Sequence, residues 1–187
     1  MFKEIKQPIN EFFEDAKKNI DTYSKYVLML PLPYCTPNGP GKFEWNDYGY
    51  FVTKAYKCLH KGYVNKCDMM KKWFFTDKSE RMQDIFDTDN IFVYADADEE
   101  GKLTFENHPF ARVVGCMCYD YDDKGQIQLN MHNIVSCCNI AFNEFSGLEK
   151  VVLILPGTTE KENHNPIVTL RNVFIYSPCE VIAVYNH

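Results

Sequence analysis

Apolar residues recur at every third or fourth position near the start of the chain, with charged residues between them. This spacing predicts an amphipathic helix over about residues 8–25. On its polar side Glu14 precedes Lys18 by four positions, the favourable order for an ion pair on a helix. The apolar stripe consists of Ile5, Ile9, Phe12, Phe13, Ala16, Ile20, Tyr23 and Val27.

A stretch rich in proline and glycine then interrupts the helical pattern. Residues 31–41 contain four prolines and two glycines. Proline fixes its own φ and has no backbone N–H, so this composition favours a long ordered loop or a linker and argues against both a helix and a central strand.

Helical spacing returns in the rest of the first half. The pattern predicts a helix from Asp47 to Gly62, where the glycine would end it, and a second helix over residues 64–74. A short further helix is expected over residues 77–86, because Asp77 and Glu80 stand at capping-pair spacing.

Beyond Asn90 apolar and polar residues alternate, which indicates strands. We expect strands at residues 91–95, 102–105, 111–119 and 126–131, forming two successive hairpins with an acidic turn in each. If these strands form a meander, both acidic turns lie at one end of the sheet, and His108 and His132 lie at the other.

The end of the chain completes the sheet. Helical spacing runs from Asn133 to Phe145, with Gly147 placed to end the helix. Residues 151–155 are apolar on both faces, which is typical of a central strand. Two more strands are expected at 167–176 and 181–185.

These elements together predict an α+β fold. A helical N-terminal half would pack on a mainly antiparallel sheet of about seven strands, with one additional helix laid across the sheet. We expect a single domain over residues 1–187, mainly helical in 1–88 with the loop at 31–41, and sheet-rich in 89–187. The segment 87–90 is too short for a free linker.

Composition narrows the class of protein. The chain has 187 residues, 45% of them apolar, and a net charge of −6. No apolar run approaches the ~20 residues that cross a bilayer, and the charged N-terminus does not resemble a secretory signal, so we expect no membrane partner and no secretion. The excess of acids argues against nucleic acid as a partner. We expect a cytoplasmic protein, or one within an intracellularly assembled particle.

The eight cysteines favour a reducing compartment. Cys58 and Cys67 fall at apolar positions of helical patterns, and Cys116 and Cys118 fall within a predicted strand. Cysteine at such positions behaves as a small apolar residue, so most of the thiols are expected to be reduced, buried and inert.

Two constellations could carry chemistry. The acidic turns would gather carboxylates suited to Ca²⁺ or Mg²⁺, although their spacing does not complete a calcium loop and solvated turn acids are the alternative. Candidate ligands are Asp96, Asp98, Glu100, Asp120, Asp122 and Asp123.

A thiol at a helix start is the second constellation. Cys137 and Cys138 stand early in a predicted helix, where the dipole lowers a thiol pKa and His132 or His108 could accept the proton. Core packing of paired cysteines is the alternative. A zinc site that also uses Cys116 and Cys118 is disfavoured, because residues two apart on a strand are too far apart to share one ion.

The predicted function is therefore contact with other proteins. We expect a non-enzymatic structural or interaction protein, a subunit of a larger intracellular or viral assembly, with no cofactor and with self or heterologous protein partners. The alternative is a small thiol-dependent or divalent-cation-dependent enzyme. Aromatic anchors dominate interface energetics, although they could equally fold back onto the core. The expected contact residues lie in or beside the proline-rich loop and are Leu32, Tyr34, Phe43, Trp45, Tyr48 and Tyr50.

Overall fold

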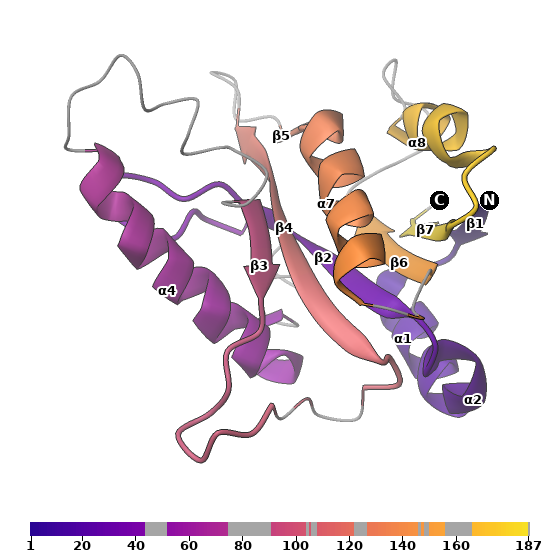
Figure 1. Ribbon diagram of the computed structural model, residues 1–187, viewed down its shortest axis with the longest axis horizontal. Coiled ribbons are helices and arrows are strands. Elements are labelled where there is room, and N and C mark those ends of the chain that lie inside the picture. Colours follow the sequence, from indigo (N-terminus) through magenta and orange to yellow (C-terminus); the bar gives the residue numbers. More distant parts are fainter. Residues whose placement is uncertain are drawn as a thin grey trace.

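A seven-stranded mixed sheet runs through the molecule (Figure 1). The computed structural model describes residues 1–43, 52–74, 91–103, 105, 108–121, 127–145, 147, 150–155 and 166–186. The strand order is β1-β7-β6-β2-β4-β3, and β5 also pairs with β4. The strands are β1 (Phe2–Lys6), β2 (Val27–Pro33), β3 (Phe92–Tyr94), β4 (Arg112–Tyr121), β5 (Ile127–Leu129), β6 (Lys150–Leu155) and β7 (Glu180–Tyr185).

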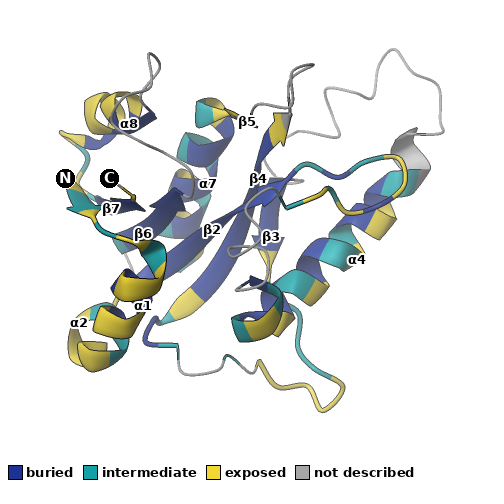
Figure 2. Cartoon of the chain, turned by 180° about the vertical axis from the view of Figure 1, so that it is seen from behind, coloured by how far each residue is buried: buried dark blue, intermediate teal, exposed yellow. Residues whose placement is uncertain are grey.

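Helices cover both faces of the sheet. They are α1 (Ile9–Lys18), α2 (Ile20–Tyr23), α4 (Lys57–Phe74), α7 (Met131–Glu144) and α8 (Pro166–Phe174). Helix α7 packs on β2, β4 and β6, and α8 packs on β1 and β7. Helices α1 and α4 lie on the opposite face, as the view from behind shows (Figure 2). Consequently the central strands β2, β6 and β7 are almost fully buried.

The mainly antiparallel sheet predicted from the sequence is wrong. Strands β1, β7, β6, β2 and β4 are parallel to one another, and only β3 and β5 run antiparallel to β4. The described part of the second half also holds α8 besides α7, where only one additional helix was expected. Parallel neighbours require a crossover between them, and α4 lies in the connection from β2 to β4 as α8 lies in the connection from β6 to β7.

One predicted strand is a helix. Residues 167–176 were expected to pair in the sheet, but they belong largely to α8. Ile167, Leu170 and Phe174 are buried, a spacing of three and four that places them on one helix face. Pro166 occupies the start of α8, where the missing N–H has no helical partner to lose.

The prolines do not keep β2 out of the sheet. Pro31 and Pro33 belong to this strand, although the sequence argued against a central strand there. Strand β6 pairs only with Val27–Met29, so the part of β2 that holds the prolines pairs with β4 alone. A proline in this part of β2 therefore loses no hydrogen bond of the sheet where its nitrogen faces the side that β6 does not reach.

The remaining predicted helices and strands are partly confirmed. Gly62 does not end a helix, because α4 runs through it, and residues 102, 103 and 105 are not in a strand. The helix over 8–25 is confirmed as α1 and α2, the helix over 133–145 as α7, and the central strand at 151–155 as β6. The helix expected at 77–86 lies outside the described residues.

Candidate functional site

At the centre of the sheet, the connections that follow two neighbouring strands lead to helices on opposite faces. Strands β2 and β6 are adjacent and parallel. The chain leaves β2 toward α4 and leaves β6 toward α8, and these helices cover opposite faces (Figures 1 and 2). In open α/β sheets such a switch point opens a crevice at the carboxyl ends of the strands, and ligands bind there. We call this region the carboxyl-edge site.

The loop that leaves β2 forms one side of the carboxyl-edge site. Thr36 and Gly39 exchange two backbone hydrogen bonds of 2.7 and 2.9 Å, and Gly39 has a φ of 120°, which favours glycine. At Gly41 a Cβ would lie 2.3 Å from the Tyr34 carbonyl oxygen. The tight turn therefore depends on both glycines.

A buried tyrosine holds this loop against helix α4. The Tyr63 hydroxyl donates to the Pro33 carbonyl at 2.9 Å and accepts from the Gly41 N–H at 2.9 Å. Burial raises the pKa of Tyr63, so its hydroxyl stays protonated and keeps donating at physiological pH. The backbone on both sides of the turn is thus fixed by one side chain.

The first turn of α7 forms the other side of the carboxyl-edge site. The Asn130 side chain caps the helix by accepting from the Asn133 N–H at 3.1 Å. Asn133 is 4% exposed, and its amide donates to the Tyr34 hydroxyl at 2.7 Å and to the Met117 carbonyl at 3.4 Å. This network joins the β2 loop, α7 and β4.

The electrostatics of the carboxyl-edge site favour a small anionic group. Helix α7 has fourteen residues and no acid in its first turn, so its amino end presents the positive end of the dipole there. Burial raises the pKa of Tyr34, which keeps its hydroxyl neutral. Asp120 near the end of β4 is exposed and limits how much negative charge a ligand can bring.

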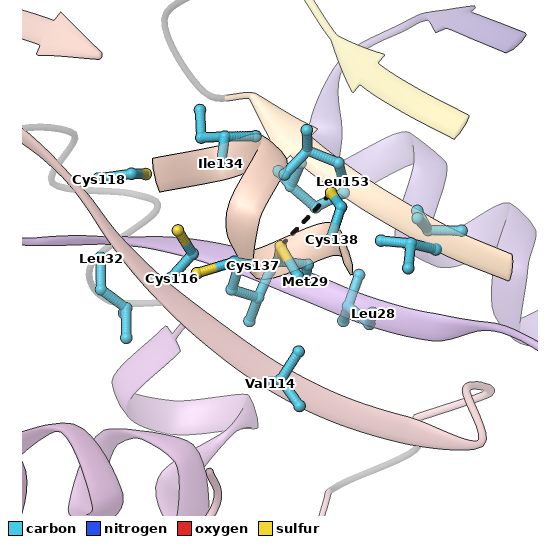
Figure 3. Packing of buried hydrophobic residues seen from close by; sticks show 14 of the residues in the cluster. Leu28, Met29, Leu32, Val114, Cys116, Cys118, Ile134, Cys137, Cys138 and Leu153 are labelled. Carbon is cyan, nitrogen blue, oxygen red and sulfur yellow. Dashed lines mark hydrogen bonds between the residues drawn. The ribbon is translucent and has the colours of Figure 1, made fainter. Parts of the chain in front are cut away.

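The thiols predicted as catalytic lie in the core beneath α7 (Figure 3). Cys137 and Cys138 are 0% exposed. Cys138 contacts the Met29 sulfur at 3.9 Å, and the Cys116 thiol lies 3.6 Å from the Asn133 carbonyl. Burial raises the pKa of Cys138 and Cys116, so both remain thiols.

The two histidines do not come together, because the predicted meander does not form. His108 precedes β4 near Ala111, whose N–H bonds to Tyr26 at the start of β2. His132 is exposed in α7, which follows β5 at the other end of β4. His108 packs edge-on against Phe105 with ring centroids 4.6 Å apart, and burial lowers its pKa.

The acidic residues are also separated. Asp96 follows β3, which runs antiparallel to β4, so it lies at the opposite end of β4 from Asp120. Asp96 accepts from Asn65 at 2.6 Å, and Asp98 accepts from the N–H groups of Glu100 and Lys102, as in an ordinary turn. Asp122 and Asp123 lie outside the described residues. Within the described part of the chain, no group of three His, Cys, Asp or Glu residues could hold a metal ion.

The expected contact aromatics are mostly internal where they are described. Leu32 is 0% exposed, and the Tyr34 hydroxyl is engaged by Asn133. Phe43 packs on Tyr63 with ring centroids 5.9 Å apart. Trp45, Tyr48 and Tyr50 lie outside the described residues.

Exposed apolar side chains also occur on α8 and on the turn that follows it. The sequence did not reveal this group, because residues 167–176 were expected to form a strand. We call it the α8 apolar surface; it consists of Val168 (48% exposed), Val173 (47%), Ile175 (50%) and Tyr176 (93%).

Comparisons with protein-family models, with curated proteins and with solved structures found no match to this chain. No helix within the described residues is long and apolar enough to span a membrane.

Proposed function

We propose that this chain binds a small molecule carrying a phosphate or carboxylate group at the carboxyl-edge site. The observation that carries this proposal is the adjacency of β2 and β6, whose connections leave toward opposite faces of the sheet. The argument rests on the fold and on the groups placed at that point, since fold alone does not define a function.

The groups at the site suit such a ligand. The amino end of α7 offers a favourable potential for an anion. Tyr34 supplies a hydroxyl, and the loop that follows it makes a tight turn in which Gly39 lies against Lys71 of α4 and Gly41 lies against Pro33. The Asn133 amide orients the Tyr34 hydroxyl at 2.7 Å.

The test uses inorganic phosphate, ADP and citrate as separate probes with the ¹⁵N-labelled protein. We expect at least one probe to shift the amide signals of Tyr34, Gly39, Gly41 and Asn133 in a saturable manner and to raise the Tm. Saturable shifts at the amino ends of the strands, or no saturable shift with any probe at millimolar concentration, would overturn the proposal.

A matched pair of variants localises the binding. Tyr34→Phe removes the hydroxyl at the carboxyl end of β2, and Tyr26→Phe removes the hydroxyl that bonds to Glu180 at the amino end, at 2.8 Å. We expect Tyr34→Phe to weaken binding by roughly 3–10-fold, as for loss of one hydrogen bond. Tyr26→Phe should leave the affinity unchanged, so equal effects of both variants would count against this site.

A second candidate function, self-assembly, is favoured by the α8 apolar surface. Val173, Ile175 and Tyr176 follow one another closely at the end of α8 and are exposed, and exposed apolar side chains that lie together mark interaction sites. We infer that a second copy of this chain packs on it through Val173 and Tyr176. Pairing of the neighbouring edge strand β1 is less favourable, because Lys3 and Lys6 on this strand discourage edge-to-edge contact.

Sedimentation velocity tests this second candidate over a range of concentrations. The wild-type chain should form a dimer or larger species, and Tyr176→Asp should shift it to monomer. Met69→Asp on α4 is the control, since Met69 is 65% exposed and lies away from the α8 apolar surface. A wild-type monomer at every concentration would exclude self-assembly through this surface.

A further inference from the structure

Two cysteines from distant parts of the chain meet where the β2 loop lies on α4. The Cys35 sulfur lies 3.8 Å from that of Met70 on α4, and Tyr63 of the same helix bonds the backbone on either side of Cys35, so Cys67, which stands between Tyr63 and Met70 on α4, adjoins Cys35. Cys67 and Met70 are three positions apart on α4, so both are on the face that meets the loop. Nothing in the carboxyl-edge site requires two thiols at this position.

We propose that Cys35 and Cys67 form an oxidisable pair that closes to a disulfide with a low-molecular-weight disulfide such as oxidised glutathione. The pair would fasten the β2 loop onto α4. This inference stands on the contact between the two side chains and does not depend on ligand binding at the carboxyl-edge site.

The residues around Cys35 hold the β2 loop on α4. The Tyr63 hydroxyl, one turn before Cys67 on α4, binds the Pro33 carbonyl and the Gly41 N–H on either side of Cys35. Further along α4, Lys71 lies next to Gly39. The loop is therefore held on the helix from both sides of Cys35, which keeps Cys35 next to the face of α4 that carries Cys67.

The two thiols have different environments, which assigns their roles. Cys35 is 5% exposed, and the hydrogen bond from Cys67 lowers its pKa. Cys67 is 0% exposed, and the hydrogen bond with Cys35 together with burial raises its pKa. Because an oxidant reaches the 5% exposed Cys35 before the fully buried Cys67, Cys35 is the attacking thiol and Cys67 resolves the intermediate.

The chemistry balances with one oxidant molecule. The Cys35 thiolate attacks one sulfur of oxidised glutathione, forming a Cys35–glutathione mixed disulfide and releasing one glutathione thiolate, which takes up a proton. Cys67 then loses its proton and attacks the Cys35 sulfur, which releases the second glutathione. Two protein thiols are oxidised to one disulfide, and one oxidised glutathione is reduced to two glutathione molecules.

Other cysteines of the chain serve as internal controls. Cys116, Cys118, Cys137 and Cys138 are 0% exposed and should stay free under native conditions. Cys179 is partly exposed and should form only a mixed disulfide with glutathione. Reaction at Cys179 shows that the oxidant is active in the same sample.

The experiment maps the thiols after native oxidation. The wild-type protein is treated with oxidised glutathione, denatured, alkylated and digested with trypsin. Cleavage at lysines gives the peptides 26–42, with Cys35, and 67–71, with Cys67. We expect these two peptides joined by a bond that dithiothreitol breaks. Absence of the joined peptides when Cys179 is fully modified would overturn the proposal.

Variants then test the order of the steps. Cys67→Ser should stop at the glutathione adduct of Cys35, and Cys35→Ser should leave Cys67 unmodified. Modification of Cys67 in Cys35→Ser at the wild-type rate would overturn the assigned roles.

A final measurement asks whether the bond fits the fold. Closing a loop of about thirty residues constrains the unfolded chain, so oxidation should raise the Tm of the wild-type protein by at least about 5 °C. A fall in Tm would show that the loop must leave α4 to form the bond, and it would contradict the contact on which the proposal rests.

Discussion

At the scale of single residues, Glu4 connects three elements of the fold. It accepts hydrogen bonds from Arg171 of α8 and, at 2.8 Å, from the Tyr185 hydroxyl of β7. Burial alone would raise the pKa of the Glu4 carboxyl, but these hydrogen bonds and the Arg171 charge outweigh burial and lower it. The ionised carboxylate therefore stabilises the folded state.

We expect Glu4→Gln to lower the free energy of unfolding by about 1–2 kcal/mol at pH 7. Since the folded-state pKa is depressed, the contribution is complete above the ordinary value of 4.5 and is lost as the pH falls through the folded-state pKa. Urea unfolding between pH 7 and 3 should show the two proteins converging. The control Glu14→Gln, at an exposed pair, should change little at any pH.

Asn133 is the one buried polar residue of the described chain. Its replacement by alanine leaves the Tyr34 hydroxyl and the Met117 carbonyl without their amide partner, and we expect a loss of about 1–3 kcal/mol of stability. A double-mutant cycle with Tyr34→Phe should show coupling between the two side chains. Additive effects of Asn133→Ala and Tyr34→Phe would mean that their 2.7 Å hydrogen bond is not what makes Asn133 important.

At the scale of elements, the approach of α4 to β3 depends on Gly62. Alanine normally stabilises a helix interior by about 1 kcal/mol relative to glycine. Here a Cβ would lie 2.0 Å from the Tyr94 carbonyl oxygen, a backbone atom that cannot turn away. We therefore expect Gly62→Ala to destabilise the protein by about 1–3 kcal/mol in urea unfolding. Asn139→Ala, at an exposed position of α7, should be neutral or slightly stabilising.

Elements whose pattern was local could be predicted from the sequence. The stripe of α1, the alternation of β4 and the apolar run of β6 each specify one conformation through neighbouring residues. Short apolar segments were ambiguous: Ile167–Phe174 fits a strand or a helix until Pro166 is considered as a first helical residue. The place of Pro31 in β2 depends on how far β6 extends beside it, which no local pattern contains.

At the scale of the molecule, the carboxyl-edge site follows from strand order. Its proposed position follows from β6 lying on one side of β2 and β4 on the other. The sequence pointed to Tyr34 as a functional residue, but as part of a surface that contacts other proteins. The sequence placed Asn133 at the start of a helix but did not reveal its hydrogen bonds, because the partners of that side chain, Tyr34 and Met117, come from other parts of the chain.

The sheet also predicts how the chain unfolds. Strand β1 from the N-terminus pairs with β7 from the C-terminus, and β2 lies between β4 and β6 from the second half. Neither residues 1–88 nor residues 89–187 contain a complete sheet, so we expect a single cooperative unit. Far-UV and near-UV circular dichroism should give coincident thermal transitions.

Removal of residues 1–6 tests this cooperativity, because it takes away β1 and leaves β7 as an edge strand. We expect the Tm to fall while the transition stays single. Hydrogen exchange should find the slowest amides in β2, β6 and β7, which open only when the whole molecule unfolds. Two separate transitions, or slow exchange that survives in one half after the other has unfolded, would contradict a single unit.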